Sequence, residues 1–307
     1  MLPRILPSLR PFAALCLLAS AGTAETALFP EPEAAVQALA QAVRTTNHAD
    51  LGALLGPAAT DLVRADSVQG IHDLAEFAAA FAQSNRLQRV TDAHAVLEIG
   101  PHRWPFPVPL IRAGGGWQFD GAAGLEELLN RRIGHNELEV LAVLRACVEA
   151  QREYASQDRD GDGVLEFAQT LSSQPGRTDG LYWSPAVNGE LSPLGPLVAQ
   201  AQAEGYFKSG PETGSGPAPF HGYYFKILRQ QGKHAPGGRH DYVINGNMVA
   251  GFAVVAWPAE HGESGIMTFL VNQQGRIHQR DLGPGTAKAV RAMKAYDPGP
   301  AWETVRD

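Results

Sequence analysis

Hydrophobic positions recur at helical spacing over one long stretch near the middle of the chain, residues 136–155. The repeat predicts an amphipathic helix with one apolar stripe and one polar face, with Asn136 as its N-cap. A helix with a single apolar stripe needs a sheet or another helix to cover that stripe. The predicted stripe consists of Leu138, Leu141, Leu144, Val148 and Ala155, widened by Val140, Cys147 and Tyr154.

Before this helix, the pattern changes from helical to alternating. The predicted helices span 33–45, 50–55 and 74–83, and the predicted strands span 93–100, 104–112 and 117–120. Pro105, Pro107 and Pro109 fall on alternate residues, which favours an edge position for their strand. A further helix at 125–132 is predicted to end at Gly134, so that a short, stiff joint precedes the long helix.

After the long helix, loops give way to a second alternating region. We predict a helix at 194–204, a Gly/Pro/Ser-rich loop at 205–219, strands at 223–228, 251–257, 265–272 and 276–281, and a helix at 286–295. The fold class is therefore α+β: N-terminal helices with an antiparallel meander, then the long helix packed on a C-terminal antiparallel sheet. The predicted domains are 28–134 and 135–296, followed by a tail at 297–307.

The first 24 residues have the composition of a secretory signal peptide, with Arg4 and Arg10, an apolar run at 12–21 and a cleavage site after Ala24. The run is too short to span a membrane. These features predict a periplasmic or secreted protein. Loss of the two arginines takes the formal net charge from −7 to −9, which argues against nucleic acids and anionic membranes as partners. Cys147 then remains as the only cysteine, so no internal disulfide is expected.

Three aspartates at alternate positions follow the long helix, in the segment Asp158-Arg159-Asp160-Gly161-Asp162-Gly163. Alternating carboxylates with a glycine for the sharp turn match the first half of an EF-hand-type calcium loop. The twelfth position, which calls for a bidentate glutamate, holds Gln169, and Glu166 stands at the ninth. The pattern predicts a calcium site at Asp158, Asp160, Asp162, Glu166 and Gln169. The alternative is a solvated turn whose aspartates hydrogen-bond their own backbone.

Aromatic residues near loops and strand starts form the second candidate site. Such residues make an adhesive surface for a protein, peptide or glycan of the envelope. The alternative is a satellite hydrophobic cluster beneath the long loops. The candidates are Tyr182, Trp183, Tyr223, Tyr224 and Trp257.

No catalytic motif is complete. Ser264 stands in Gly262-Glu263-Ser264-Gly265, which lacks the spacing of a nucleophile elbow. Glu260, His261 and Glu263 would serve as acid/base groups only if buried. The preferred hypothesis is a non-enzymatic binding or assembly module. The alternative is a hydrolase or other enzyme acting on an envelope polymer or peptide, with its site near 260–263 or inside the first domain. There, the inward-facing candidates are Trp104, Phe106, Trp117 and Phe119.

Two resemblances refine the fold. Helices followed by a meander resemble the cystatin-like cone of the nuclear-transport-factor-2-like superfamily, whose members often hold a ligand pocket. The second half looks like the globular part of type IV pilin-like proteins, in which an amphipathic helix packs on a small antiparallel sheet. The residues that carry this likeness are Arg145, Ala150, Tyr154, Gly222-Tyr223-Tyr224-Phe225, Phe252, Ala256-Trp257-Pro258, Gly262, Gly265, Thr268-Phe269, Asn272 and Gly275-Arg276-Ile277.

Nearly the whole mature chain is similar to the bacterial family named domain of unknown function 2950. This resemblance implies an exported envelope protein and brings no activity with it. The matching stretches are Trp104-Pro105-Phe106-Pro107, EELLNRRIGHNE at 126–137, QREYASQDRDGDGVLE at 151–166, Asp179-Gly180-Leu181-Tyr182-Trp183, His221-Gly222-Tyr223-Tyr224 and 265–269.

Overall fold

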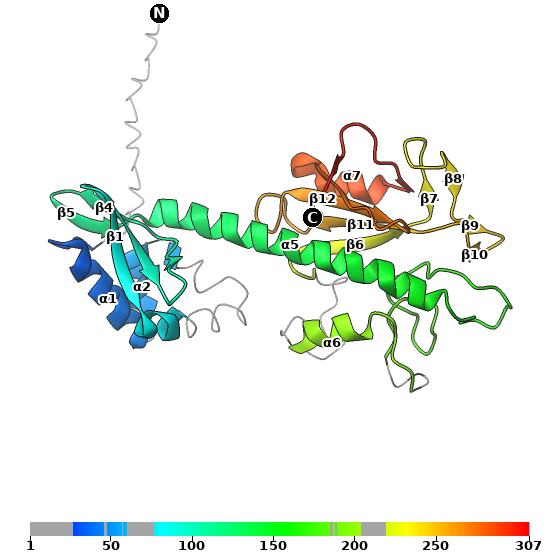
Figure 1. Cartoon of the computed structure of the whole chain (residues 1–307), viewed down its shortest axis with the longest axis horizontal. Coiled ribbons are helices and arrows are strands. Elements are labelled where there is room, and N and C mark those ends of the chain that lie inside the picture. Colours follow the sequence, from blue (N-terminus) through cyan, green and yellow to red (C-terminus); the bar gives the residue numbers. More distant parts are fainter. Residues whose placement is uncertain are drawn as a thin grey trace, which may run out of the picture.

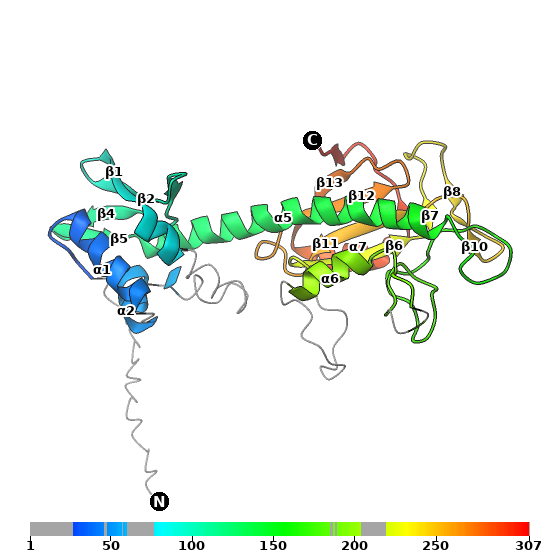
Figure 2. The same ribbon diagram turned by 60° about the horizontal axis from the view of Figure 1, so that its bottom comes forward.

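A computed structural model gives the fold, and its described residues are 27–45, 48–56, 58–59, 77–184, 187, 189–203 and 219–306. Two folded units lie at opposite ends of one long helix, α5 (Gly121–Tyr154), as both views show (Figure 1, Figure 2). Helices and antiparallel sheets occur together, which confirms the predicted α+β class. The predicted signal peptide, residues 74–76 of a predicted helix and the loop at 205–218 lie outside the described residues.

The N-terminal unit packs helices on one antiparallel sheet. Its elements are α1 (Pro32–Arg44), α2 (His48–Leu55), β1 (Asn85–Thr91), β2 (His94–Ile99), β3 (Trp104–Pro105), β4 (Leu110–Ala113) and β5 (Gly116–Phe119). The sheet order is β1-β2-β4-β5, and β3 pairs with β2. Residues 77–83 are also helical. Ala35, Leu39 and Ala42 recur at helical spacing on α1 and lie in the same core as Leu97 and Leu110 of the sheet.

Aromatic side chains contribute to the core that this sheet shares with the N-terminal helices. Phe106, Trp117 and Phe119 are buried as predicted, but Trp104 is 45% exposed, so its predicted inward position is wrong. Its ring lies 4.7 Å from the guanidinium carbon of Arg131 on α5. A cation over an indole face is a favourable contact at a surface, which explains why this tryptophan faces outward.

Two strand predictions here need correction. The strand predicted at 104–112 is two strands, β3 and β4, with Pro107 and Pro109 in the irregular stretch between them. Prolines lack the N–H that a sheet ladder requires, so pairing is interrupted where they accumulate. Strand β1 was not predicted, because it is mostly polar and exposed and therefore lacks an alternating apolar pattern.

Helix α5 is continuous through Gly134, so the prediction of two helices separated there is wrong. The N-cap is Asp120, whose Oδ1 accepts a hydrogen bond from the backbone N–H of Ala123 at 3.1 Å. Asn136 is an interior residue rather than an N-cap, and its Nδ2 donates to Ser264 O at 2.8 Å.

The buried stripe of α5 also differs from the prediction. Leu138 is 68% exposed and does not belong to the buried stripe. That stripe runs along Ile133, Asn136, Val140, Val143, Leu144, Cys147, Val148, Gln151 and Tyr154.

In the C-terminal unit, α5 packs on a five-stranded antiparallel sheet of order β15-β13-β12-β11-β6. Val140, Leu144 and Cys147 of α5 share one core with Val254 and Leu270 of the sheet, as the long-helix prediction requires. The strands are β6 (Tyr223–Leu228), β11 (Ala253–Pro258), β12 (Met267–Asn272), β13 (His278–Asp281) and β15 (Glu303–Thr304). The segment predicted as a tail therefore supplies an edge strand.

Smaller elements surround this sheet. They are α6 (Gly195–Ala203), β7 (Gln230–Gln231), β8 (His240–Asp241), β9 (Val243–Ile244), β10 (Asn247–Met248), η1 (Gly283–Gly285), α7 (Thr286–Ala292) and β14 (Ala295–Tyr296). Strands β9 and β10 form a hairpin, and β14-β7-β8 form a separate sheet. None of the helices within the described ranges combines the length and hydrophobicity needed to cross a bilayer.

Candidate metal centre at the end of the long helix

The acidic loop that follows α5 is anchored at both ends. On α5, Gln151 is fully buried and forms two hydrogen bonds with the backbone of Ala168: its Nε2 donates to the carbonyl and its Oε1 accepts from the N–H, both at 2.8 Å. At the last helical residue, Tyr154 Oη donates to Thr178 O at 3.0 Å. Paired bonds to one residue 17 positions away fix the ends of the loop, so the aspartates project from a defined frame.

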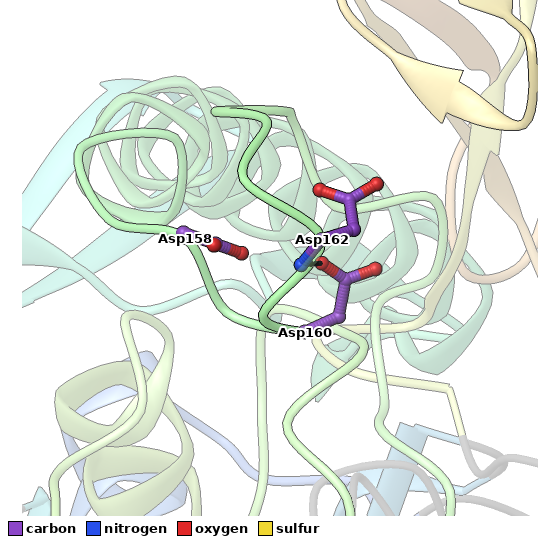
Figure 3. Close-up of side chains that lie close together, drawn as sticks. All are labelled: Asp158, Asp160 and Asp162. Carbon is purple, nitrogen blue, oxygen red and sulfur yellow. Dashed lines mark hydrogen bonds between the residues drawn. The ribbon is translucent and has the colours of Figure 1, made fainter.

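Between these anchors, Asp158, Asp160 and Asp162 gather on one turn. Each offers a carboxylate oxygen within 4.8 Å of the others, so the cluster can hold a metal ion. Figure 3 shows the three side chains on this turn, with Asp158 facing the other two. Gly161 and Gly163 have φ of 79° and 84°, a region that glycine enters without steric cost, and they allow the chain to bend around the cluster.

The same carboxylates also cap their own backbone, as the alternative prediction states. Asp158 accepts from the N–H groups of Gly161 at 2.8 Å and Gly163 at 2.9 Å, and Asp162 accepts from Val164 at 2.8 Å. Asp160 has the weakest bond of this kind, with Asp162 N at 3.3 Å. A carboxylate has about four lone-pair positions, so these bonds orient the oxygens and leave room for a cation.

Hydrogen bonds from the loop backbone favour the ionised form of Asp158. The N–H groups of Gly163 and Gly161 stabilise the charged form of Asp158 and lower the pKa of its carboxyl group. Arg159 turns away from this cluster. Its side chain is only 10% exposed, and its guanidinium carbon lies 5.2 Å from the Trp183 ring and 5.8 Å from the Tyr154 ring. The exposed turn therefore presents three carboxylates, while the arginine between them packs inward.

Glu166 is not a member of the carboxylate cluster, and Gln169, which has no carboxylate, makes hydrogen bonds elsewhere. Glu166 Oε2 accepts from the backbone N–H of Met248 at 2.7 Å, and Gln169 Nε2 donates to Gly246 O at 2.6 Å. Both side chains thus bind the β9–β10 hairpin instead. Asn247 of that hairpin donates to Asp162 Oδ2 at 2.6 Å, so it joins the cluster to the C-terminal unit.

The roles of Gln151 and Asn247 in holding the acidic loop were not predicted from the sequence. Gln151 was detectable, because it stands seven residues after Leu144, on the apolar stripe of the long helix. A polar residue on such a stripe needs a buried hydrogen-bond partner, and the following loop supplies it. Asn247 gave no comparable signal, because its partner Asp162 lies 85 residues away in the chain.

The predicted aromatic surface is only partly exposed. Trp183 and Tyr223 are 2% and 0% exposed, so these two belong to the core and cannot contact a partner. The Trp183 indole donates to Glu190 O at 3.2 Å, and Tyr223 Oη donates to Met267 O at 3.0 Å. Tyr182 is half-buried. Tyr224 and Trp257 are also half-buried and pair across β6 and β11, with ring centroids 5.7 Å apart.

The groups considered for acid/base chemistry do not form a buried set. His261 Nε2 lies 2.8 Å from Asp281 Oδ1, and Glu260 is exposed.

A depression of about 330 Å³ lies at the β12–β13 turn, and Arg145, Arg276 and Thr304 are among its lining residues. Its lining holds no carboxylate, histidine or cysteine, so that depression offers no general base.

The fold and the acidic turn define an α+β protein built on a long connecting helix, with a loop able to hold a cation. The chain belongs to the family described as "protein of unknown function (DUF2950)", whose model matches residues 26–305. This match confirms the family resemblance seen in the sequence. No curated protein matches the chain, and no solved structure matches it. The pilin-like and cone-like resemblances stay predictions.

Proposed function

We propose that this protein is an exported, non-enzymatic envelope module that binds or helps to assemble other envelope components, and that calcium stabilises its acidic loop. The observation that carries the proposal is the gathering of Asp158, Asp160 and Asp162 at the end of α5. Export is inferred from the signal-peptide composition of the first 24 residues. The half-buried Tyr224–Trp257 pair supplies an aromatic surface suited to a protein, peptide or glycan.

Calcium fits the donor set better than softer metals do. All three groups are carboxylates, and hard cations such as calcium prefer six to eight oxygen ligands. Glu166 and Gln169 bind the β9–β10 hairpin, so water would complete the coordination. A site with so few protein ligands belongs to the weak class, with a dissociation constant of about 10⁻⁴–10⁻³ M. Such a site responds to calcium at extracytoplasmic concentrations.

The hydrolase alternative needs either a deep pocket in the first unit or buried acid/base groups near residues 260–263, where Glu260 is exposed. The candidate interior is instead occupied by Phe106, Trp117 and Phe119, whose side chains are 5%, 2% and 1% exposed. Phe106 and Phe119 contact each other edge to face, with ring centroids 6.1 Å apart. This packing supports a structural role for that unit.

A thermal unfolding series with calcium and with a chelator tests the ion. We expect about 10 mM calcium to raise the melting temperature of the wild-type protein, since an ion that binds only the native state stabilises it by mass action. Asp160→Ala should abolish the rise. This position is the most suitable, because Asp160 makes the weakest bond within the loop and its loss disturbs the fold least.

Asp92→Ala is the matched control, because Asp92 is an exposed aspartate in the turn between β1 and β2. It should keep the full calcium response. An unchanged wild-type melting temperature in calcium would remove the ion from the proposal, and so would an equal rise in Asp160→Ala.

The binding role is tested with purified protein and envelope fractions, in calcium and in chelator. Retention of the wild-type protein should be greater in calcium, while Asp160→Ala should be retained equally in both. Absence of retention under every condition would contradict a binding module.

A further inference from the structure

Two histidines and a glutamate lie near one another where α5 meets the C-terminal unit. His135 and Glu139 are four residues apart on α5, so they share one face of the helix. His221 comes from the turn before β6. Its Nε2 lies 4.0 Å from Glu139 Oε2, and its ring stands edge to face with that of His135, with centroids 6.4 Å apart. Two elements distant in sequence thus bring two imidazoles and one carboxylate near one another, although their ligand atoms do not all lie within 4.8 Å as those of the three aspartates do.

His221 is held in an uncommon conformation. It is 6% exposed, and its φ of 46° lies in the left-handed region that few non-glycine residues adopt. The next residue, Gly222, fixes the turn against α5, because a Cβ there would lie 2.8 Å from Asn136 Nδ2 and 2.9 Å from Ser264 Cβ. A left-handed φ at a non-glycine residue such as His221 persists only where the surrounding structure enforces it. The imidazole of His221 is therefore positioned before any ligand arrives.

We propose that His135, Glu139 and His221 form a binding site for a divalent transition metal ion of the zinc type, with water completing the coordination. Imidazole nitrogen and carboxylate oxygen are ordinary zinc ligands, and three protein ligands plus water make a complete tetrahedral set. The acidic loop differs in kind, because it offers oxygen alone. The two sites are thus selective for different metals.

For both imidazoles to bind one metal ion, His135 must move closer to His221. Two imidazoles on one tetrahedral zinc have ring centroids roughly 5 Å apart, given the usual metal–nitrogen distance. The observed 6.4 Å must therefore shorten by a little over 1 Å. His135 is exposed on the helix surface and can change rotamer, while His221 stays fixed.

A metal here would tie α5 to the start of β6. The neighbouring residues already make this junction: Asn136 donates to Ser264 O, and Glu137 Oε1 accepts from Ile266 N at 2.9 Å. Zinc would add a cross-link between the helix and the turn at 220–222. It would stabilise the junction between the helix and the C-terminal unit without involving the acidic loop.

Metal titration of the tag-free protein, first stripped with a chelator, tests this inference. Zn²⁺ is titrated by calorimetry and Co²⁺ by visible absorption, both in the Asp160→Ala background and in the wild type. We expect one equivalent bound in both, with the intense absorption of four- or five-coordinate Co²⁺ rather than the weak bands of an octahedral oxygen site.

His135→Ala, Glu139→Gln and His221→Asn should each weaken binding by more than the roughly 10- to 100-fold typical of losing an outer-shell partner. Asn is chosen at 221 because it tolerates a positive φ. His102→Ala, an exposed histidine between β2 and β3, is the control and should bind as the wild type does.

Three outcomes would overturn the site: no Zn²⁺ binding, binding unchanged in His135→Ala, or only an octahedral Co²⁺ spectrum. If His221→Asn fails to fold by circular dichroism, His135→Ala decides, because His135 is exposed and its loss leaves the core intact.

Discussion

Glu137 is the residue that joins the long helix to the sheet. Its Oε1 accepts from the backbone N–H groups of Ile266 and Met267, both at 2.9 Å, and lies 3.4 Å from Tyr223 Oη. Burial, with the nearby Glu137 carboxylate as a second cause, raises the pKa of the Tyr223 hydroxyl, so this hydroxyl stays protonated and can donate. A single carboxylate thus satisfies donors at the start of β12.

Removal of this carboxylate should destabilise the fold. We expect Glu137→Ala to lower the free energy of unfolding by about 2 kcal/mol, because two partly buried N–H groups lose their acceptor. Urea denaturation measures the change. Glu149→Ala is the control: that carboxylate is 71% exposed and should matter by no more than about 0.5 kcal/mol. Equal stability of Glu137→Ala and the wild type would show that the junction does not depend on these bonds.

At the scale of elements, α5 decides the architecture, and its two interior glycines differ. An added Cβ at Gly134 would have nothing within 4 Å, whereas at Gly124 it would lie 2.6 Å from Val108 Cγ2. Gly124 therefore lets the helix approach the N-terminal sheet closely. Gly134 is instead an exposed helical position without a packing role.

This difference gives a matched pair of substitutions. Gly134→Ala should stabilise the protein by about 0.5–1 kcal/mol, because alanine loses less conformational entropy than glycine in a helix. Gly124→Ala should destabilise it by about 1–3 kcal/mol through overpacking against Val108. Thermal unfolding compares the two. A loss of stability in Gly134→Ala would indicate that the helix is interrupted there.

Elements could be predicted from the sequence where their hydrophobic alternation or residue spacing lies within one short segment. Strand β6 and the positions of β11 and β12 follow from apolar alternation, and the three clustered aspartates follow from their spacing. The continuity of α5 was missed because Gly134 and Asn136 resemble a helix end and a new cap, although one interior glycine costs only about 1 kcal/mol. The partners of Glu166 and Gln169 depend on a hairpin some 80 residues away, which no local pattern contains.

At the scale of the whole molecule, α5 sets the separation of the two folded units (Figure 1). At 1.5 Å per residue, its 34 residues extend about 50 Å. The N-terminal core ends on its first turns and the C-terminal core begins near Val140, so the helix is the structural link between them. The acidic loop and the proposed zinc site lie at the two ends of its C-terminal half. Both would stiffen the attachment of the helix to the same unit.

The most direct test is a distance across position 134 within α5. Spin labels on Asn130→Cys and Glu149→Cys, both exposed, can be measured by double electron–electron resonance. Burial raises the pKa of the Cys147 thiol to about 12, so this cysteine should remain unlabelled. The unsubstituted chain from residue 25 onward, which lacks Cys16, verifies this when it is carried through labelling. A continuous helix predicts one narrow distribution near 28 Å between the two backbone positions, since they are 19 residues apart. A broad distribution, or a second population at clearly shorter distance, would contradict a single uninterrupted helix between the two units.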